Sequence, residues 1–307
     1  MIAEAKLSEI RPIILDGGTG TEIRARGYAL HPSAWSALAH IERPDLVLDV
    51  HHDFLAAGAE IVTANTFSLS RHNLEHAGIG NRFIESNLQA MKLAREAVDA
   101  LVDRQALVAG SISTIPPMDA PNYLQTGNSA FQNYKDQAEI LAGAGADLIL
   151  AEMLLEVESA SVLLEAAQTV GLPVWAGLSA MFGDDETVMG FRTPGKYLHV
   201  KDNRFSDLVQ TVAGFPVELV AVMHTKMDVM PAALTVVKQG WDGPVAAYAE
   251  TGQSGDSDWF FDTAAAPEAY ASAAVEWVQD FDVDAVGGCC GTRPAHISAL
   301  AAAVGRA

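Results

Sequence analysis

The stretch DLILAE, at residues 147–152, has the composition of a strand that is buried on both faces and ends in an acidic residue. Seven further short apolar runs lie along the chain, and several begin after proline, glycine or aspartate. None of the eight alternates cleanly between apolar and polar residues, which is typical of parallel strands covered on both faces. The other seven are PIILD (12–16), EIVTAN (60–65), ALVAGSI (106–112), PVWAGLS (173–179), VELVAVMH (217–224), PVAAYAE (244–250) and VDAVGG (283–288).

Amphipathic segments lie between most of these runs and predict helices, for example at residues 43–58, 81–103, 157–171 and 267–281. Several of them end in glycine before the next run, which is a common way for a helix to stop. Eight strand–helix units predict an α/β protein, a single (β/α)8 TIM barrel that spans residues 1–307. A doubly wound sheet is the alternative, but no Gly-x-Gly-x-x-Gly motif opens a helix.

The overall composition narrows the class of protein further. The formal net charge is −20, and a surface this acidic repels phosphate, so we expect no nucleic-acid partner. No apolar run approaches the roughly 20 residues needed to cross a bilayer, and the N-terminus lacks the apolar core of a signal peptide. Two cysteines make no disulfide framework. We therefore expect a cytoplasmic protein without a membrane partner, and leave its oligomeric state open.

Each apolar run ends in a polar residue or leads directly to one. In a (β/α)8 barrel the carboxyl ends of all strands meet at one face, where the catalytic groups lie. Packing alone does not explain polar residues at this point of every strand, so we expect them to converge on one site. They are Asp16, Asn65, Ser111, Glu152, Ser179, His224, Glu250 and the pair Cys289–Cys290.

The adjacent cysteines Cys289 and Cys290 predict a metal site. Neighbouring cysteines rarely form a disulfide with each other, because the bond geometry would strain the trans peptide between them. Two thiolates favour zinc among the common cytosolic metals, and a catalytic zinc needs a third protein ligand and an open position. His224, at the end of its strand, is the best candidate for that ligand. The alternatives are two small buried hydrophobic residues and a histidine bonded to a backbone carbonyl.

Two carboxylates at strand ends suggest a site for an amino acid. Asp16 is followed by two glycines, whose backbone N–H groups can point at an anion, although an ordinary strand–helix turn has the same composition. Glu152 is either a partly buried carboxylate awaiting a ligand ammonium group or a plain loop residue. Together with zinc, these groups would suit an α-amino acid that carries a thiol.

The chain resembles the homocysteine S-methyltransferase family. The resemblance rests on LDGGTGTEIRARG, HHDFLAAGAEIVTANTF, LILAEM and GGCCGTRPAHI, and covers nearly the whole chain. It implies a zinc enzyme that transfers a methyl group to homocysteine and makes methionine. In the family the paired cysteines bind zinc, which carries over to Cys289 and Cys290. The family's head-group residues correspond to Asp16 and Gly17, and its acidic residue for the amino group corresponds to Glu152.

Two positions depart from the family's pattern. The family normally has a third zinc thiolate where this chain has His224, and two thiolates with one imidazole still make a sound zinc site. A less anionic zinc forms the substrate thiolate at lower pH but makes it a weaker nucleophile, which calls for a strongly activated donor. The other departure is Glu250, where many relatives have a Pro-Asn pair. It is a fourth zinc ligand, a contact for a cationic donor or a solvated carboxylate.

The donor should carry its methyl group on a sulfonium or quaternary ammonium centre, for which aromatic side chains make a suitable pocket. Trp35 and Phe67 correspond to aromatic positions that the family uses near the donor, and Trp259 and Phe260 lie on a later loop. S-methylmethionine or S-adenosylmethionine is the first choice of donor, and betaine or another methylated osmolyte is the second. A different thiol acceptor, a homocysteine-binding paralogue without catalysis and a metal-free lyase are the rival functions.

Overall fold

The computed structural model describes residues 12–120, 127–191, 203–252 and 265–305. Eight of the described strands form one parallel sheet, in the order β1-β10-β9-β8-β5-β4-β3-β2. A parallel bridge between Leu15 and Ile61 joins the two edges, so the sheet closes into a barrel. The strands are β1 (Ile13–Ile14), β2 (Ile61–Thr63), β3 (Leu107–Ser113), β4 (Leu148–Leu154), β5 (Val174–Leu178), β8 (Leu219–Lys226), β9 (Val245–Glu250) and β10 (Ala285–Val286).

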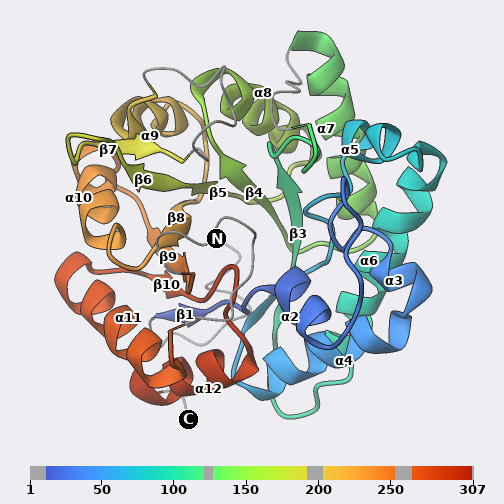
Figure 1. Cartoon of the computed structure of the whole chain (residues 1–307), viewed down its shortest axis with the longest axis horizontal. Helices are drawn as coiled ribbons and strands as arrows, with labels where there is room; N and C mark the ends of the chain where they lie inside the picture. The colour runs from blue at the N-terminus through green and yellow to red at the C-terminus, as the bar shows by residue number, and fades with distance from the viewer. Residues whose placement is uncertain (1–11, 121–126, 192–202, 253–264, 306–307) are drawn as a thin grey trace.

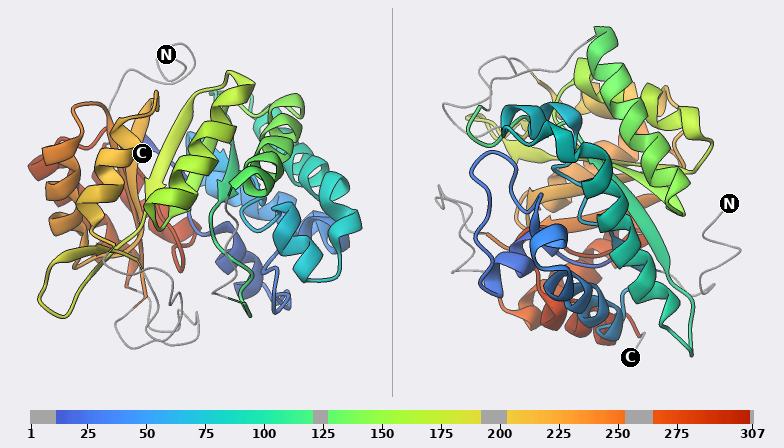
Figure 2. Two further views of the ribbon diagram at one scale, coloured as in Figure 1. Left: turned by 90° about the horizontal axis from the view of Figure 1, so that it is seen from above. Right: turned by 90° about the vertical axis from the view of Figure 1, so that its right-hand side faces the viewer.

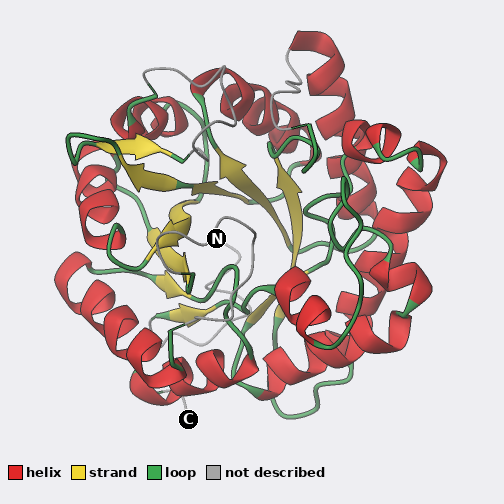
Figure 3. Cartoon of the chain, in the orientation of Figure 1, coloured by secondary structure: helices red, strands yellow, loops and turns green. Residues whose placement is uncertain are grey.

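Helices surround the barrel as an outer ring (Figures 1 and 3). They follow the strands in the chain, so that each crossover returns along the outside of the sheet. The helices are α2 (Thr19–Ala25), α3 (Ala39–Glu42), α4 (Pro44–Ala56), α5 (Arg71–His76), α6 (Phe83–Asp99), α7 (Gly127–Gly143), α8 (Val157–Ala167), α9 (Phe205–Ala213), α10 (Met230–Gly240), α11 (Pro267–Phe281) and α12 (Pro294–Ala303), with 3-10 turns at Gly80–Arg82 and Gln168–Val170.

The strand residues divide between two hydrophobic cores because successive side chains point to opposite faces of a sheet. On β9, Ala246 and Tyr248 fill the inside of the barrel, whereas Val245, Ala247 and Ala249 pack against the helices. Both faces are therefore apolar, which explains why the sequence shows continuous apolar runs without alternation. The buried core occupies the barrel interior and the layer between sheet and helices.

The structure confirms the predicted (β/α)8 barrel and all eight predicted strands. The doubly wound alternative is wrong, because such a sheet stays open at both edges whereas this one closes. An antiparallel hairpin after β5 was not expected, with strands β6 (Ala180–Phe182) and β7 (Val188–Gly190). It projects beyond the ring of helices in the side view of Figure 2. Among the described residues, no helix is long and apolar enough to cross a membrane.

Candidate metal centre and substrate pocket

A pocket of about 950 Å³, counted with its opening to solvent, lies at the carboxyl ends of the strands. Six of the polar residues predicted to converge there line it, which confirms that the strand ends share one site. Three others, Ser111, Ser179 and Glu250, stand outside the lining. The six lining residues are Asp16, Asn65, Glu152, His224, Cys289 and Cys290.

His224 reaches this pocket through an irregularity in β8. The register between β8 and β9 shifts between Met223 and Lys226, and His224 itself has a positive φ of 42°. Met223 already points into the barrel, so regular alternation would turn the next residue outward. The bulge instead turns the imidazole toward the pocket, as bulges near functional sites often do. A left-handed conformation at a histidine is strained and is held here by the surrounding structure.

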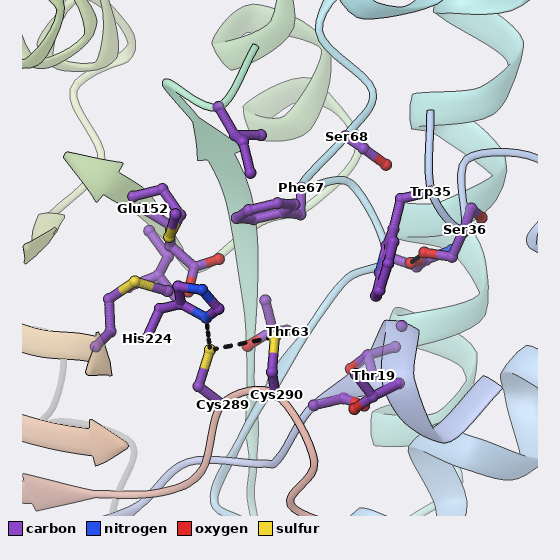
Figure 4. Close-up of a pocket in the computed structure, with 18 of the residues that line it drawn as sticks. Thr19, Trp35, Ser36, Thr63, Phe67, Ser68, Glu152, His224, Cys289 and Cys290 are labelled. Atoms are coloured by element: carbon purple, nitrogen blue, oxygen red, sulfur yellow. Dashed lines mark hydrogen bonds between the residues drawn. The ribbon is translucent and has the colours of Figure 1, made fainter. Parts of the chain in front are cut away.

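His224, Cys289 and Cys290 form a compact group whose ligand atoms all lie within 4.8 Å of one another (Figure 4). The Sγ atom of Cys289 lies 3.7 Å from Nδ1 of His224 and 3.9 Å from Sγ of Cys290. A tetrahedral zinc with bonds of about 2.3 Å to sulfur and about 2.0 Å to nitrogen would separate two sulfur ligands by about 3.8 Å, and a sulfur from a nitrogen by about 3.5 Å. The donor atoms and the two distances from Cys289 therefore fit a tetrahedral metal ion, and the third pair lies within 4.8 Å.

The charges within this group are strongly coupled. The contact with the Cys290 thiol, assisted by His224, lowers the pKa of Cys289 well below its usual value, whereas the same contact and burial raise the pKa of Cys290. Burial lowers the pKa of His224, but the negative charges of Glu250 and Cys289 outweigh it and raise that pKa to about 9. The protein thus stabilises a thiolate at Cys289, the form in which cysteine binds metals.

Glu250 lies against His224 and does not line the pocket. Its Oε2 atom is 3.4 Å from Nδ1 of His224, and the residue is only 7% exposed. The interpretation as a solvated carboxylate is therefore wrong, because the end of β9 packs against the end of β8 and covers this side chain. Its placement outside the lining also gives no support to a direct contact with a donor.

Asp16 and Gly17 line the same pocket as His224 and the two cysteines. Both carboxylate oxygens of Asp16 accept hydrogen bonds from Thr63, from the backbone N–H at 2.7 Å and from the hydroxyl at 2.9 Å. Burial still raises the pKa of Asp16 to about 7. A side chain at position 17 would come within 2.7 Å of the Phe54 ring and 2.8 Å of Thr292, so only glycine fits there. The absence of a side chain lets the Gly17 backbone pack closely against Phe54 and Thr292, and Gly17 itself lines the pocket.

Glu152 is a buried carboxyl group that also lines the pocket, near Cys289 and Asp16. The hydroxyl of Ser111 donates a hydrogen bond to its Oε2, and the hydroxyl of Tyr248 donates one to its Oε1 at 3.3 Å. Burial raises the pKa of Glu152 to about 8, with the nearby Cys289 and Asp16 acting in the same direction. Without a cationic partner the group is thus largely protonated at neutral pH. A ligand ammonium group would restore its charge.

Trp35 and Phe67 line the pocket on the side away from His224 (Figure 4). Trp35 has a positive φ of 55°, and its indole lies so close to Gly20 that a side chain there would come within 2.2 Å of Nε1. Three residues of the loop after β3 complete this surface, namely Ile115, Pro116 and Met118. We call these five residues the aromatic wall. The later aromatic candidates Trp259 and Phe260 lie outside the described residues.

Several residues that support the site were not predicted from the sequence. Thr63 lies at the end of β2, where it holds Asp16, and Tyr248 lies two positions before the end of β9. The strand alternation provides a signal for both, because inward-facing residues recur at every second position. His296, on the helix that follows the cysteines, has a structural position, because its two ring nitrogens contact backbone groups of Arg293 and Ala265.

The fold and pocket define a (β/α)8 barrel with a group of one histidine and two cysteines that could hold a metal ion, beside two buried carboxyl groups. Residues 13–304 match the model of the family described as homocysteine S-methyltransferase. The chain therefore belongs to the homocysteine S-methyltransferase family, a family of enzymes.

Known proteins of similar sequence and structure agree with this assignment. Homocysteine S-methyltransferase of Escherichia coli is 29% identical, over 94% of this chain and 94% of its own. Homocysteine S-methyltransferase 2 of Arabidopsis thaliana is 26% identical, over 94% and 91%. The crystal structure of the homocysteine methyltransferase MmuM from Escherichia coli, in its metallated form, has the same fold, with a TM-score of 0.76 and 24% identity over 98% of this chain and 99% of that one.

Proposed function

We propose that the protein transfers a methyl group from a sulfonium or quaternary ammonium donor to the thiol of homocysteine, giving methionine. S-methylmethionine and S-adenosylmethionine are the favoured donors, and betaine is the second choice. Residues 1–307 would form one homocysteine-binding barrel domain. The observation that supports this function best is that His224, Cys289 and Cys290 line the same pocket as Asp16 and Glu152.

The metal in this proposal is zinc, held by His224, Cys289 and Cys290. Zinc bound there would lower the pKa of the homocysteine thiol, so that the sulfur is a thiolate at neutral pH. Three protein ligands leave the fourth tetrahedral position for the substrate sulfur, as in other catalytic zinc sites. The soft donor set, with two sulfurs and one imidazole, suits zinc better than magnesium or calcium.

The pocket residues would orient homocysteine for the reaction. The backbone at Gly17 and the carboxylate of Asp16 would receive the amino-acid head group, and Glu152 would bind its ammonium group as a carboxylate. Holding the head group fixes the position of the sulfur, and a well-oriented pair of reactants accounts for a large part of catalysis. The buried position of Glu152 makes its charge available only when a cation is bound, which favours an amino acid over a neutral thiol.

The aromatic wall would hold the methyl donor opposite the sulfur. The faces of Trp35 and Phe67 attract an onium centre, and their apolar surface keeps water away from the reacting atoms. The sulfur lone pair of homocysteine forms a bond to the methyl carbon while the bond from that carbon to the donor breaks. The donor leaves with that electron pair as a neutral thioether or tertiary amine. The proton of the thiol is released before this step.

Metal analysis and a donor screen test the proposal. The purified protein is expected to contain about one zinc per chain. It should convert homocysteine to methionine with at least one of S-methylmethionine, S-adenosylmethionine or betaine. If the zinc-loaded protein binds homocysteine but methylates it with none of these donors, methyl transfer is contradicted and a thiol-binding paralogue remains. If it binds no homocysteine but methylates another thiol, the acceptor is wrong.

A further inference from the structure

Arg293 connects two segments of the pocket. One is the loop that carries the two cysteines, residues 287–293, which we call the metal loop. The other is α2, the helix that follows residues 16–18, which we call the head-group wall. It lies three positions after Cys290 and directly before α12, while its partner Glu22 lies on α2 (Figure 1). The guanidinium group donates from Nε to Oε2 of Glu22 at 2.7 Å and from the terminal Nη2 to Oε1 at 3.2 Å. This two-point contact joins segments that are 271 residues apart in the sequence.

The carboxylate of Glu22 is buried although its helix is short. It is 2% exposed, and Arg26 also donates to its Oε1, at 2.9 Å. A buried carboxylate is costly unless it is paired, and here two arginines pair it. They differ in their attachment: Arg26 follows α2 itself and binds Asp53 of α4, whereas Arg293 belongs to the metal loop. Of the two arginines, only Arg293 ties α2 to the segment that holds the cysteines.

Other hydrogen bonds join the same two segments at the pocket. The backbone N–H of Gly18 donates to the hydroxyl of Thr292 at 3.1 Å, and the backbone N–H of Gly291 donates to the hydroxyl of Thr21 at 3.1 Å. A side chain on Gly18 would come within 2.6 Å of the carbonyl oxygen of Cys289, so the two backbones pack in direct contact. The head-group wall and the metal loop thus meet along one continuous seam.

The cysteines themselves have separate supports. The backbone N–H of Cys289 donates a hydrogen bond to the carbonyl oxygen of Ala249 at 2.9 Å. The backbone N–H of Thr251 donates one to the carbonyl oxygen of Cys290 at 3.0 Å. These bonds fix both cysteines to β9 and would remain if the Arg293 contact were lost. Loss of that contact would therefore loosen the seam with α2 without dismantling the group of metal ligands.

We propose that Arg293 and Glu22 are positioning residues that clamp the Gly17–Gly18 segment to the metal loop and so set the distance between the head-group wall and the metal. Homocysteine is a short molecule that must span this distance, with its head group at Gly17 and its sulfur at the metal. An error of about 1 Å in such a placement costs up to a hundredfold in rate. This inference rests on the proposed function, because it takes homocysteine as the spanning ligand.

The test compares Arg293→Gln with Arg26→Gln, since each variant removes one of the two arginines from Glu22. For Arg293→Gln we expect zinc affinity to stay within about twofold and the dissociation constant of homocysteine, measured calorimetrically on the zinc-loaded protein, to rise about tenfold. KM for homocysteine should rise more than kcat falls, and Arg293→Lys should recover part of the affinity. Arg26→Gln should lower the melting temperature but leave homocysteine binding unchanged.

Amide hydrogen exchange provides a readout that does not depend on the substrate. The amides of Gly18 and Gly291 should exchange several-fold faster in Arg293→Gln and at the wild-type rate in Arg26→Gln. Equal effects of the two substitutions on homocysteine binding, or unchanged exchange at both glycines, would overturn the clamp. If the wild-type protein binds zinc but no homocysteine, the proposed function fails, and the exchange rates alone then decide whether the clamp exists.

Discussion

The side of the pocket that holds the candidate metal ligands is built from strands and from a loop bonded to a strand, whereas the aromatic wall is built from loops alone. We call Glu152, His224, Cys289 and Cys290 the metal wall. Glu152 lies on β4 and His224 on β8, whereas the two cysteines lie on the loop after β10, which backbone hydrogen bonds fix to Ala249 and Thr251 at the end of β9. The aromatic wall comes from the segments after β1, β2 and β3. Strand ends are held by the hydrogen bonds of the sheet, while loops are held by fewer contacts and tolerate change.

This difference implies a division of labour between chemistry and specificity. The metal wall contains strongly perturbed titratable groups, with the pKa of Glu152 at about 8 and that of His224 at about 9. The five residues of the aromatic wall carry no ionisable group. Substitutions in the metal wall should therefore strongly weaken binding of the metal or of the amino acid. Substitutions in the aromatic wall should weaken binding of the donor by a smaller factor.

The largest effect is expected for His224→Ala. It removes one of the three proposed metal ligands, and direct ligands matter more than supporting residues, whose loss already costs about 10-fold to 100-fold in metal affinity. We therefore expect zinc affinity, measured by competition with a chelator, to fall by more than about a hundredfold, with a parallel loss of methyl transfer. His51→Ala is a matched control, because His51 is fully buried on α4 outside the pocket. Unchanged zinc occupancy in His224→Ala would show that His224 is not a ligand.

A smaller effect is expected for Glu152→Gln, because in the proposed function this group binds the substrate and not the metal. Norvaline, in which a methyl group replaces the thiol of homocysteine, isolates the head group. Since the pKa of Glu152 is about 8, the carboxyl is mostly protonated at pH 7 and must release a proton to bind ammonium. Affinity for norvaline should therefore increase about fivefold from pH 7 to pH 8 and level off above, by the ionised fraction alone.

In Glu152→Gln this part of the rise should disappear and leave about a twofold rise, the part that Asp16 contributes because its pKa is about 7. Affinity at pH 8 should be about tenfold or more below the wild type. Glu60→Gln is the control, because Glu60 is also a buried carboxylate but lies before β2 and accepts a bond from the backbone of Ile14. Calorimetry in buffers of different ionisation enthalpy measures the released proton directly. A flat pH profile in the wild-type protein would contradict the proposed pairing of Glu152 with the ammonium group.

The same contrast explains what the sequence could and could not predict. Cys289, Glu152 and Asp16 were found because each follows an apolar run, and barrel geometry then brings strand ends together. The orientation of Glu250 was not found, since it depends on the bulge between Met223 and Lys226 that places His224 beside it. The sequence around His224 contains no glycine or proline that would indicate the bulge or the positive φ.

The aromatic wall was predicted only in part for a related reason. Trp35 and Phe67 came from resemblance to the family, while Ile115, Pro116 and Met118 gave no signal, because loops have no periodicity from which burial can be inferred. The β6–β7 hairpin was missed because its short strands lie in a polar segment, AMFGDDETVMG at residues 180–190.

The smallest effect is expected at the aromatic wall, in Trp35→Leu and Phe67→Leu. Each substitution keeps an apolar side chain but removes the π face, which is worth about 1 kcal/mol toward a cation or about fivefold in affinity. KM for an onium donor should rise by about that factor in each variant, while the homocysteine dissociation constant stays unchanged. Trp35→Phe keeps a π face and should lie between Trp35→Leu and the wild type. Steady-state kinetics with both substrates varied separates the two constants. If the homocysteine dissociation constant rises and KM for the donor does not, the aromatic wall belongs to the amino-acid site. The division between the two walls would then be wrong.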